Sequence, residues 1–165
     1  MPRYQTRILL PVPLVVALAV TAALAGSAAA RATTRLSAQA AVKISTGDVP
    51  GLGTVLVDAR GRTLYMFVPD KQRHVTCIGT CAAIWPPVKL ATGGKPVAAG
   101  RAKASLLGSD PNPAGGRVVT YHGWPLYTYV TDTRARVATG QALNLNGGLW
   151  YVLAPSGKIV RTKVA

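Results

Sequence analysis

The sequence predicts a mostly β fold: a small antiparallel β domain built from two related hairpin repeats, with short helical pieces. Two segments, 61–70 and 123–132, share five identical residues at a fixed offset of 62, which indicates an internal duplication. Each segment follows a run rich in β-branched residues and a turn, a pattern typical of a β-hairpin. The length of 165 residues suits a single domain of this kind.

Residues 1–30 are typical of a secretory signal peptide. Two arginines precede an apolar run over 8–24, and small residues follow up to Ala30. The A-x-A rule places cleavage after Ala30. The apolar run is 17 residues long and is interrupted by two prolines, so an uncleaved membrane anchor stays open as the alternative.

The rest of the chain divides into a spacer and one folded domain. Residues 31–45 are Ala, Thr, Arg, Ser and Gln without periodicity, which predicts a disordered spacer. We expect the β domain over 46–165, with the first repeat at about 54–90 and the second at about 117–160. A loose stretch rich in Gly, Pro and Ala, 91–116, links them.

Each repeat begins with a predicted hairpin. In the first repeat, the β-rich run 54–57 is followed by the turn 58–61 and then by an aromatic strand. In the second, the run 117–121 is followed by the shorter turn 122–123 and an equivalent strand.

Alternation along the aromatic strands predicts which side chains share a sheet face. With a period of two, Tyr65 and Phe67 point to one face, and so do Tyr127 and Tyr129 of the second repeat. The other face then receives Leu64, Met66 and Val68. We expect both faces to be covered.

The remaining elements are shorter. The runs 149–153 and 158–160 are separated by Ala-Pro-Ser-Gly at 154–157, which favours a third hairpin. Helix is expected only in short pieces, near 81–85 and 102–107.

Charge and composition limit the classes of function. Cleavage after Ala30 lowers the net charge from +14 to +12, and the sequence contains no glutamate. Mechanisms that need a Glu are therefore excluded, and neither a phosphate-binding loop nor a serine nucleophile elbow is present. We expect a non-enzymatic module without a cofactor. Its positive charge favours an anionic cell-envelope polymer or lipid surface as partner, and no specific nucleic acid.

The only two cysteines, Cys77 and Cys81, predict a structural disulfide, because an exported chain with an even count usually forms one. Gly79 is expected to bend the chain between them, because Cβ atoms four apart on a regular helix are too distant for a disulfide. Two alternatives stay open. The two cysteines could act as a redox pair in thiol–disulfide exchange. Alternatively, sulfur and imidazole groups could bind copper or zinc, and the candidate ligands are Met66, His74, Cys77, Cys81 and His122.

Asp70 and Asp132 end the two repeated segments at equivalent positions. An acid at the end of a strand commonly accepts hydrogen bonds from the backbone of the following turn, so a structural role is expected. Paired carboxylates for acid–base chemistry are the alternative. Most aromatic residues are needed for the core of so small a domain. A candidate ligand surface beside the second turn consists of Tyr121, His122 and Trp124.

These motifs carry a family resemblance. Both 64–70 and 126–132 fit Tyr-x-aromatic-x-x-Asp, and 77–87 fits Cys-x-x-x-Cys-Ala-x-x-Trp-Pro-Pro. Over about 50–160, the chain resembles the secreted-repeat family of unknown function, also described as predicted bacterial lipoproteins with a Yx(FWY)xxD motif. The resemblance implies a secreted or envelope protein with no established activity. Many members look lipid-anchored, but this chain has no Cys near Ala30, so we expect release or retention by charge alone.

Overall fold

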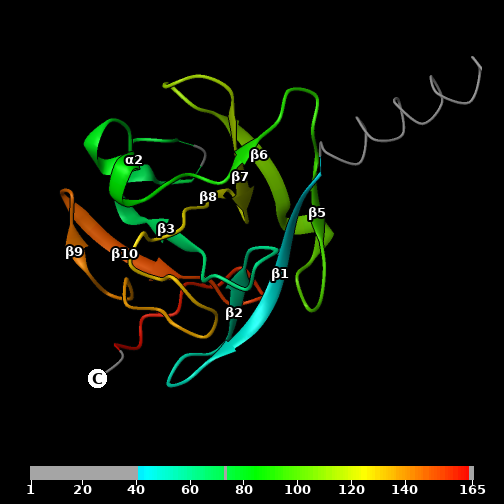
Figure 1. The fold of residues 1–165 in the computed structure, drawn as a ribbon. Helices are drawn as coiled ribbons and strands as arrows, with labels where there is room; N and C mark the ends of the chain where they lie inside the picture. The colour runs from blue at the N-terminus through cyan, green and yellow to red at the C-terminus, as the bar shows by residue number, and fades with distance from the viewer. Residues whose placement is uncertain (1–40, 73, 164–165) are drawn as a thin grey trace, which may run out of the picture. The chain divides into compact units, whose positions relative to one another are not determined.

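The structure is a computed structural model that describes residues 41–72 and 74–163 (Figure 1). The predicted signal peptide and most of the predicted spacer lie outside these residues. The described elements are, in chain order, β1 (Val42–Val49), β2 (Gly53–Val57), β3 (Tyr65–Phe67), η1 (Val68–Asp70), α2 (Thr80–Ile84), β4 (Lys89–Leu90), β5 (Pro96–Ala98), η2 (Ala104–Leu106), β6 (Leu107–Pro111), β7 (Arg117–Tyr121), β8 (Trp124–Pro125), β9 (Asn144–Leu145) and β10 (Gly148–Val152).

The strands form three small sheets. Their orders are β2-β1-β5, β3-β10-β9 and β4-β7-β6, with β8 also paired to β7. All pairings are antiparallel except β1 with β5. The prediction of a mostly β fold with short helical pieces is confirmed, and α2 and η2 fall where helix was expected. Among the described residues, no helix has the length and apolar character needed to cross a membrane.

The structure corrects two predictions about the organisation of the chain. Residues 42–45, assigned to the spacer, belong to β1, where Ile44 is fully buried and the strand pairs with both β2 and β5. The stretch 91–116 is not merely a loose link, because it contributes β5, η2 and β6. β6 pairs with β7, the next strand along the chain, whereas β5 pairs with β1 at the start of the described residues.

The core consists of two clusters, and the predicted alternation separates them correctly. Tyr65, Phe67 and Tyr127 belong to what we call the second core cluster, with Tyr129 packed against it. The residues in alternate register, Leu64, Met66 and Leu126, belong to the first core cluster. Val68 is the exception: it is 38% exposed, because the strand ends at Phe67 and the chain enters η1.

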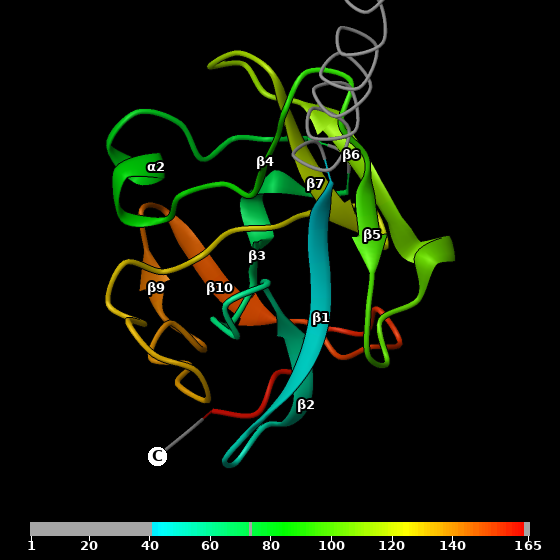
Figure 2. The same ribbon diagram turned by 45° about the vertical axis from the view of Figure 1, so that its right-hand side comes forward.

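The two repeats are interlocked. β10 of the second repeat pairs with β3 of the first, side by side in Figures 1 and 2. Conversely, Pro87 of the first repeat bridges Tyr127 of the second. The equivalent residues Tyr65 and Tyr127 exchange both backbone hydrogen bonds, with N···O distances of 2.8 and 2.9 Å. Neither repeat therefore completes its pairing without the other.

The last predicted hairpin is present in reduced form. The turn 154–157 closes with a hydrogen bond from the Gly157 amide to the Ala154 carbonyl, 2.8 Å long. Leu153 and Ile159 form a single antiparallel bridge, so the second arm is extended but is not a full strand.

Candidate functional site

The repeated tyrosines and aspartates join the two repeats at the centre of the domain. The Tyr65 hydroxyl donates to Asp132 Oδ2 over 2.5 Å, and the Tyr127 hydroxyl donates to Asp70 Oδ2 over 2.6 Å. Each tyrosine thus binds the aspartate of the other repeat. All four residues are buried.

The second oxygen of each aspartate holds the loop that follows it. Asp70 Oδ1 accepts from the amide and hydroxyl of Thr76, at 2.7 and 2.6 Å. Asp132 Oδ1 accepts from the same two groups of Thr139, at 3.0 and 2.6 Å. The predicted backbone bonds to the following turn are confirmed. The tyrosine partner from the opposite repeat was not predicted, and the duplication was the only signal for it.

Burial sets the protonation of this centre. Desolvation, followed by the hydrogen bond and charge of Asp132, raises the pKa of Tyr65 far above its ordinary value. Desolvation and the charge of Asp70 do the same for Tyr127. Both tyrosines are therefore neutral donors at physiological pH. The pKa of Asp70 is also raised, because the cost of burial exceeds the opposing effect of the bonds from Thr76 and Tyr127.

A column of four stacked rings runs through the second core cluster. Phe67 stacks on Trp150 at a centroid distance of 4.1 Å, Trp150 on Trp85 at 3.9 Å, and Trp85 on Tyr129 at 4.0 Å. Trp85 is fully buried, and its Nε1 has no hydrogen-bond partner in the described part of the chain. The column ends at the half-buried ring of Tyr129, which lines a hollow at the surface.

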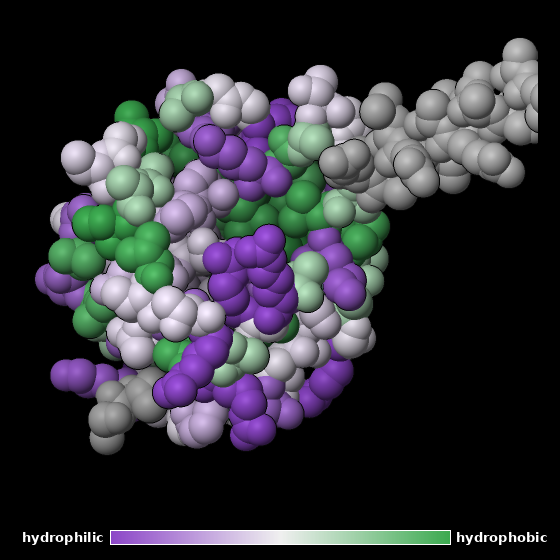
Figure 3. All heavy atoms as spheres, viewed as in Figure 1, coloured by the Kyte–Doolittle hydropathy of each residue, from purple (hydrophilic) through white to green (hydrophobic). Residues whose placement is uncertain are grey.

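That hollow is part of a basic groove. Two cavities of about 320 and 440 Å³ share the lining residues Arg60, Arg62, Pro86 and Thr128. Arg134 lines the first cavity, and Lys43 lines the second. We call these two cavities together the basic groove. Figure 3 shows hydrophilic side chains gathered in the middle of this face, over the segment between β2 and β3.

The turn between β2 and β3 positions two of the four cations. Asp58 Oδ1 accepts from the backbone amides of Arg60 and Arg62, and Asp58 Oδ2 accepts from Arg62 Nε at 2.8 Å. Gly61 has a φ of +79°, and a Cβ added there would lie 3.1 Å from the Ala135 Cβ. The turn is therefore packed against the loop that carries Arg134. Arg62–Asp58 is the one ion pair in the described part of the chain.

The structure joins Cys77 and Cys81 in a disulfide with a Cα–Cα distance of 5.2 Å. Gly79, with a φ of +58°, turns the chain between them at the start of α2, as predicted. The alternative metal site is not formed. Its two candidate cysteine ligands are bonded to each other, and Met66 is buried in the first core cluster, whereas Cys77 lies in the second. Within residues 41–72 and 74–163, no three His, Cys, Asp or Glu side chains are grouped to hold a metal ion.

The structure does not place Tyr121, His122 and Trp124 together on an exposed surface. Tyr121 is fully buried; its hydroxyl accepts from the Lys103 amide at 2.8 Å and donates to the Pro155 carbonyl at 2.7 Å. Trp124 packs against the first core cluster. Only His122 is exposed.

Sequence reasoning missed the basic groove. The two arginines in the turn 58–62 were a signal, because turn residues stay exposed. Arg134 lies more than 70 residues further along the chain, and the sequence alone does not bring it to this turn.

Together the fold and these sites define a class of protein: a duplicated β domain in which the repeated motif is buried and fastens the two halves together. The chain belongs to the family described as a secreted repeat of unknown function. Residues 48–89 and 111–154 match that family, one segment in each repeat, and together they exceed half of the chain. The description supports an extracytoplasmic location. No curated protein and no solved structure matches the chain.

Proposed function

We propose that this protein is a non-enzymatic, extracytoplasmic module that binds an anionic polymer of the cell envelope in the basic groove. The observation that carries the proposal is the convergence of Lys43, Arg60, Arg62 and Arg134 on two adjoining cavities. The chain folds so that cations from three separate segments face one concave surface. A concave surface suits a flexible chain of negative charges better than a flat lipid bilayer.

The distribution of acids supports the same proposal. Asp70 and Asp132 are buried against tyrosine hydroxyls, and Asp58 is bound to Arg62. Asp58 lines the second cavity and offsets the charge of Arg62, whereas Lys43, Arg60 and Arg134 form no ion pair with a described acid. The buried motif also supports a non-enzymatic role, because hydroxyl and amide donors already occupy both oxygens of Asp70 and Asp132.

The proposal extends to processing. We place cleavage after Ala30, so that the exported chain begins at Arg31. Intact-mass measurement of the exported protein tests this step, and a retained apolar segment would contradict it.

The binding experiment compares two variants with the same change in charge. Arg60→Ser/Arg134→Ser removes two cations from the groove, whereas Lys95→Ser/Lys158→Ser removes two exposed cations that do not line it. Wild type and each variant are passed over immobilised poly(glycerol phosphate), and their retention is measured as the salt concentration rises. An exposed ion pair contributes up to about 1 kcal/mol, so the groove variant should lose affinity on the order of tenfold, with a smaller loss for the control.

Equal losses in the two variants would show that diffuse charge, and not the groove, holds the polymer. Wild-type retention that does not weaken with salt would also contradict the proposal, because screening weakens attraction between exposed charges. Anionic phospholipid vesicles form the second arm: tighter binding to vesicles than to the polymer would favour a membrane surface.

A further inference from the structure

A second cavity occupies the position equivalent to the basic groove in the other repeat. In the groove, Gly61 lies against Ala135; in the second repeat, Gly123 has a φ of +80°, and a Cβ added there would lie 3.3 Å from Gln72 Cβ. With the offset of 62, His122 corresponds to Arg60, and Gln72 corresponds to Arg134. His122, Gly123 and Gln72 line a cavity of about 550 Å³, which we call the polar cleft.

The polar cleft differs from the groove in charge. None of its ten described lining residues is Lys or Arg, although basic residues outnumber acids by 19 to 5 in the sequence. Its one carboxylate belongs to Asp110 on β6. The Oδ2 atom of Asp110 is buried and has no hydrogen-bond partner among residues 41–72 and 74–163. Buried polar atoms are normally paired, and an unpaired one costs free energy.

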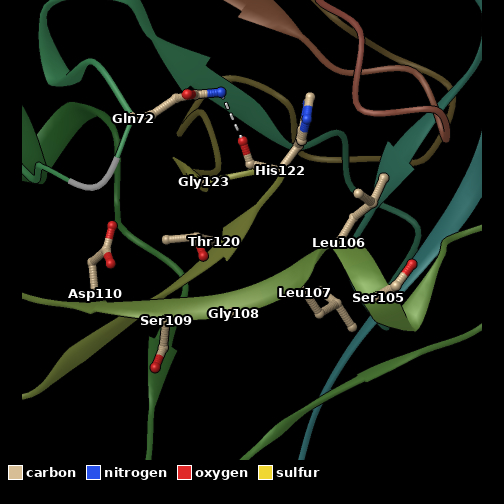
Figure 4. A pocket seen from close by; sticks show the side chains of 10 residues that line it. All are labelled: Gln72, Ser105, Leu106, Leu107, Gly108, Ser109, Asp110, Thr120, His122 and Gly123. Atoms are coloured by element: carbon tan, nitrogen blue, oxygen red, sulfur yellow. Dashed lines mark hydrogen bonds between the residues drawn. The ribbon is translucent and has the colours of Figure 1, made fainter.

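The groups around Asp110 complete a site that can bind a ligand. Figure 4 shows Asp110 and Thr120 on the same side of β6 as Gln72 and His122, while Ser109 points to the other side. Gln72 Nε2 donates to the His122 carbonyl at 3.1 Å, which ties the two walls together. Thr120 is 4% exposed, and Gly108 leaves room beside its hydroxyl, because a Cβ at 108 would lie 2.9 Å from that oxygen.

Charge selects the class of ligand. An anion would meet the Asp110 carboxylate, and a cation would be repelled by the strongly positive protein as a whole. A neutral molecule with several hydroxyls meets neither penalty. It can donate to Asp110 and exchange hydrogen bonds with Thr120, and its apolar ring face can pack on Leu106. The volume lies within the range of about 300–1,000 Å³ typical of small-molecule sites.

We propose that the polar cleft binds a neutral carbohydrate, with Asp110 accepting hydrogen bonds from its hydroxyl groups. The duplication then gives one domain two related cavities with different ligands: an anionic chain in the groove and an uncharged sugar in the cleft. The cleft does not depend on the groove cations, so the two proposals can fail separately.

The test is a titration of the exported protein followed by amide chemical shifts, with N-acetylglucosamine, maltose and cellobiose as neutral probes. Spermidine and glycerol phosphate are the cationic and anionic comparisons. We expect at least one sugar to shift the amides of Gly108, Thr120 and Gly123. Asp110→Asn should weaken that binding on the order of tenfold, because a charged acceptor is lost. Asp48→Asn, which removes an exposed acid bonded to Thr54, should not.

A second variant tests the site without removing the charge of Asp110. Gly108→Ala crowds the Thr120 hydroxyl and should also weaken sugar binding, while Arg60→Ser/Arg134→Ser should leave it unchanged. The proposal is overturned if none of the three sugars shifts these amides, if spermidine or glycerol phosphate shifts them and the sugars do not, or if Asp110→Asn and Asp48→Asn bind the sugar equally.

Discussion

The tyrosine hydroxyls of the repeated motif act as hydrogen-bond donors between the two halves of the domain. Tyr127 reaches Asp70 and Tyr65 reaches Asp132, each over a distance typical of a strong bond to a carboxylate. Both hydroxyls are held neutral by burial. The spacing of tyrosine and aspartate within one repeat therefore does not describe a contact within that repeat.

Removing one hydroxyl should destabilise the fold measurably. In Tyr127→Phe, Asp70 Oδ2 loses its tyrosine donor inside the protein, which should lower the free energy of unfolding by about 1–3 kcal/mol. Urea denaturation monitored by circular dichroism measures this change in the free energy of unfolding. Tyr151→Phe is the control, because Tyr151 is also buried but its hydroxyl makes no hydrogen bond to another residue within 41–72 and 74–163. Equal stability of Tyr127→Phe and wild type would show that the bond contributes little.

Asp70 should make stability depend on pH. Burial raises the pKa of Asp70 above its ordinary value of 3.8, so the folded state holds this proton more tightly than the unfolded state. The resulting stabilisation is fully present below 3.8 and is lost as pH rises through the raised pKa. The free energy of unfolding of wild type relative to Asp70→Asn should therefore fall as the pH is raised from acid to neutral.

Urea denaturation of both proteins over that pH range checks this expectation. Asp48→Asn, at an exposed carboxylate, provides the comparison for a simple loss of charge. A difference between wild type and Asp70→Asn that is constant with pH, or that grows as the pH rises, would contradict the raised pKa.

At the scale of single elements, the disulfide fixes the short helix α2. Cys81 lies within α2 and Cys77 precedes it, and Cys77 is buried in the second core cluster. The helix spans only five residues, so its own hydrogen bonds do not stabilise it in isolation. The disulfide and the packing of Trp85 after it hold this segment in place.

Loss of the disulfide should weaken the domain without unfolding it. Closing so short a loop stabilises by about 2 kcal/mol in the chain-entropy model, so Cys77→Ala/Cys81→Ala should lower the free energy of unfolding by about that amount. Near-ultraviolet circular dichroism should still report packed aromatic rings, because the stacked column does not include either cysteine. A variant that is unfolded at room temperature would show that the disulfide is essential to the fold.

The elements differ in how well local sequence specifies them. Alternation placed Tyr65 and Met66 on opposite faces correctly, because side-chain period in a strand is a local property. Strand β6 escaped prediction because its sequence, Leu-Gly-Ser-Asp-Pro, lacks β-branched residues and it is held by pairing with β7. The start of β1 was missed for a similar reason: its partner β5 lies about 50 residues away.

At the scale of the whole molecule, the interlocked repeats predict a single folding unit. β3 is completed by β10, and the central tyrosines exchange backbone hydrogen bonds across the repeats. Half of the domain cannot unfold while the other half keeps its pairing. Thermal unfolding followed by tryptophan fluorescence and by far-ultraviolet circular dichroism should give coincident transitions. Two separate transitions would mean that the repeats fold independently.

The candidate sites were less predictable than the fold because they depend on this interlocking. Composition indicated an anionic partner, but the groove forms only when the turn at Arg60 packs against the loop that carries Arg134. Tyr121 was misjudged because a residue beside a turn can still be buried by a distant segment, here the carbonyl of Pro155 and the backbone of Lys103.

The exchange of Tyr65 and Tyr127 between Asp132 and Asp70 also bears on ancestry. A primordial chain with a single copy of the motif would have had no aspartate correctly placed for its own tyrosine. Two such chains, associated as a symmetric homodimer, would satisfy each other in the way that the two repeats do now. Joining the two copies in one chain makes the same contacts intramolecular, and the two repeats can then differ in their surface residues, as Arg60 and His122 do.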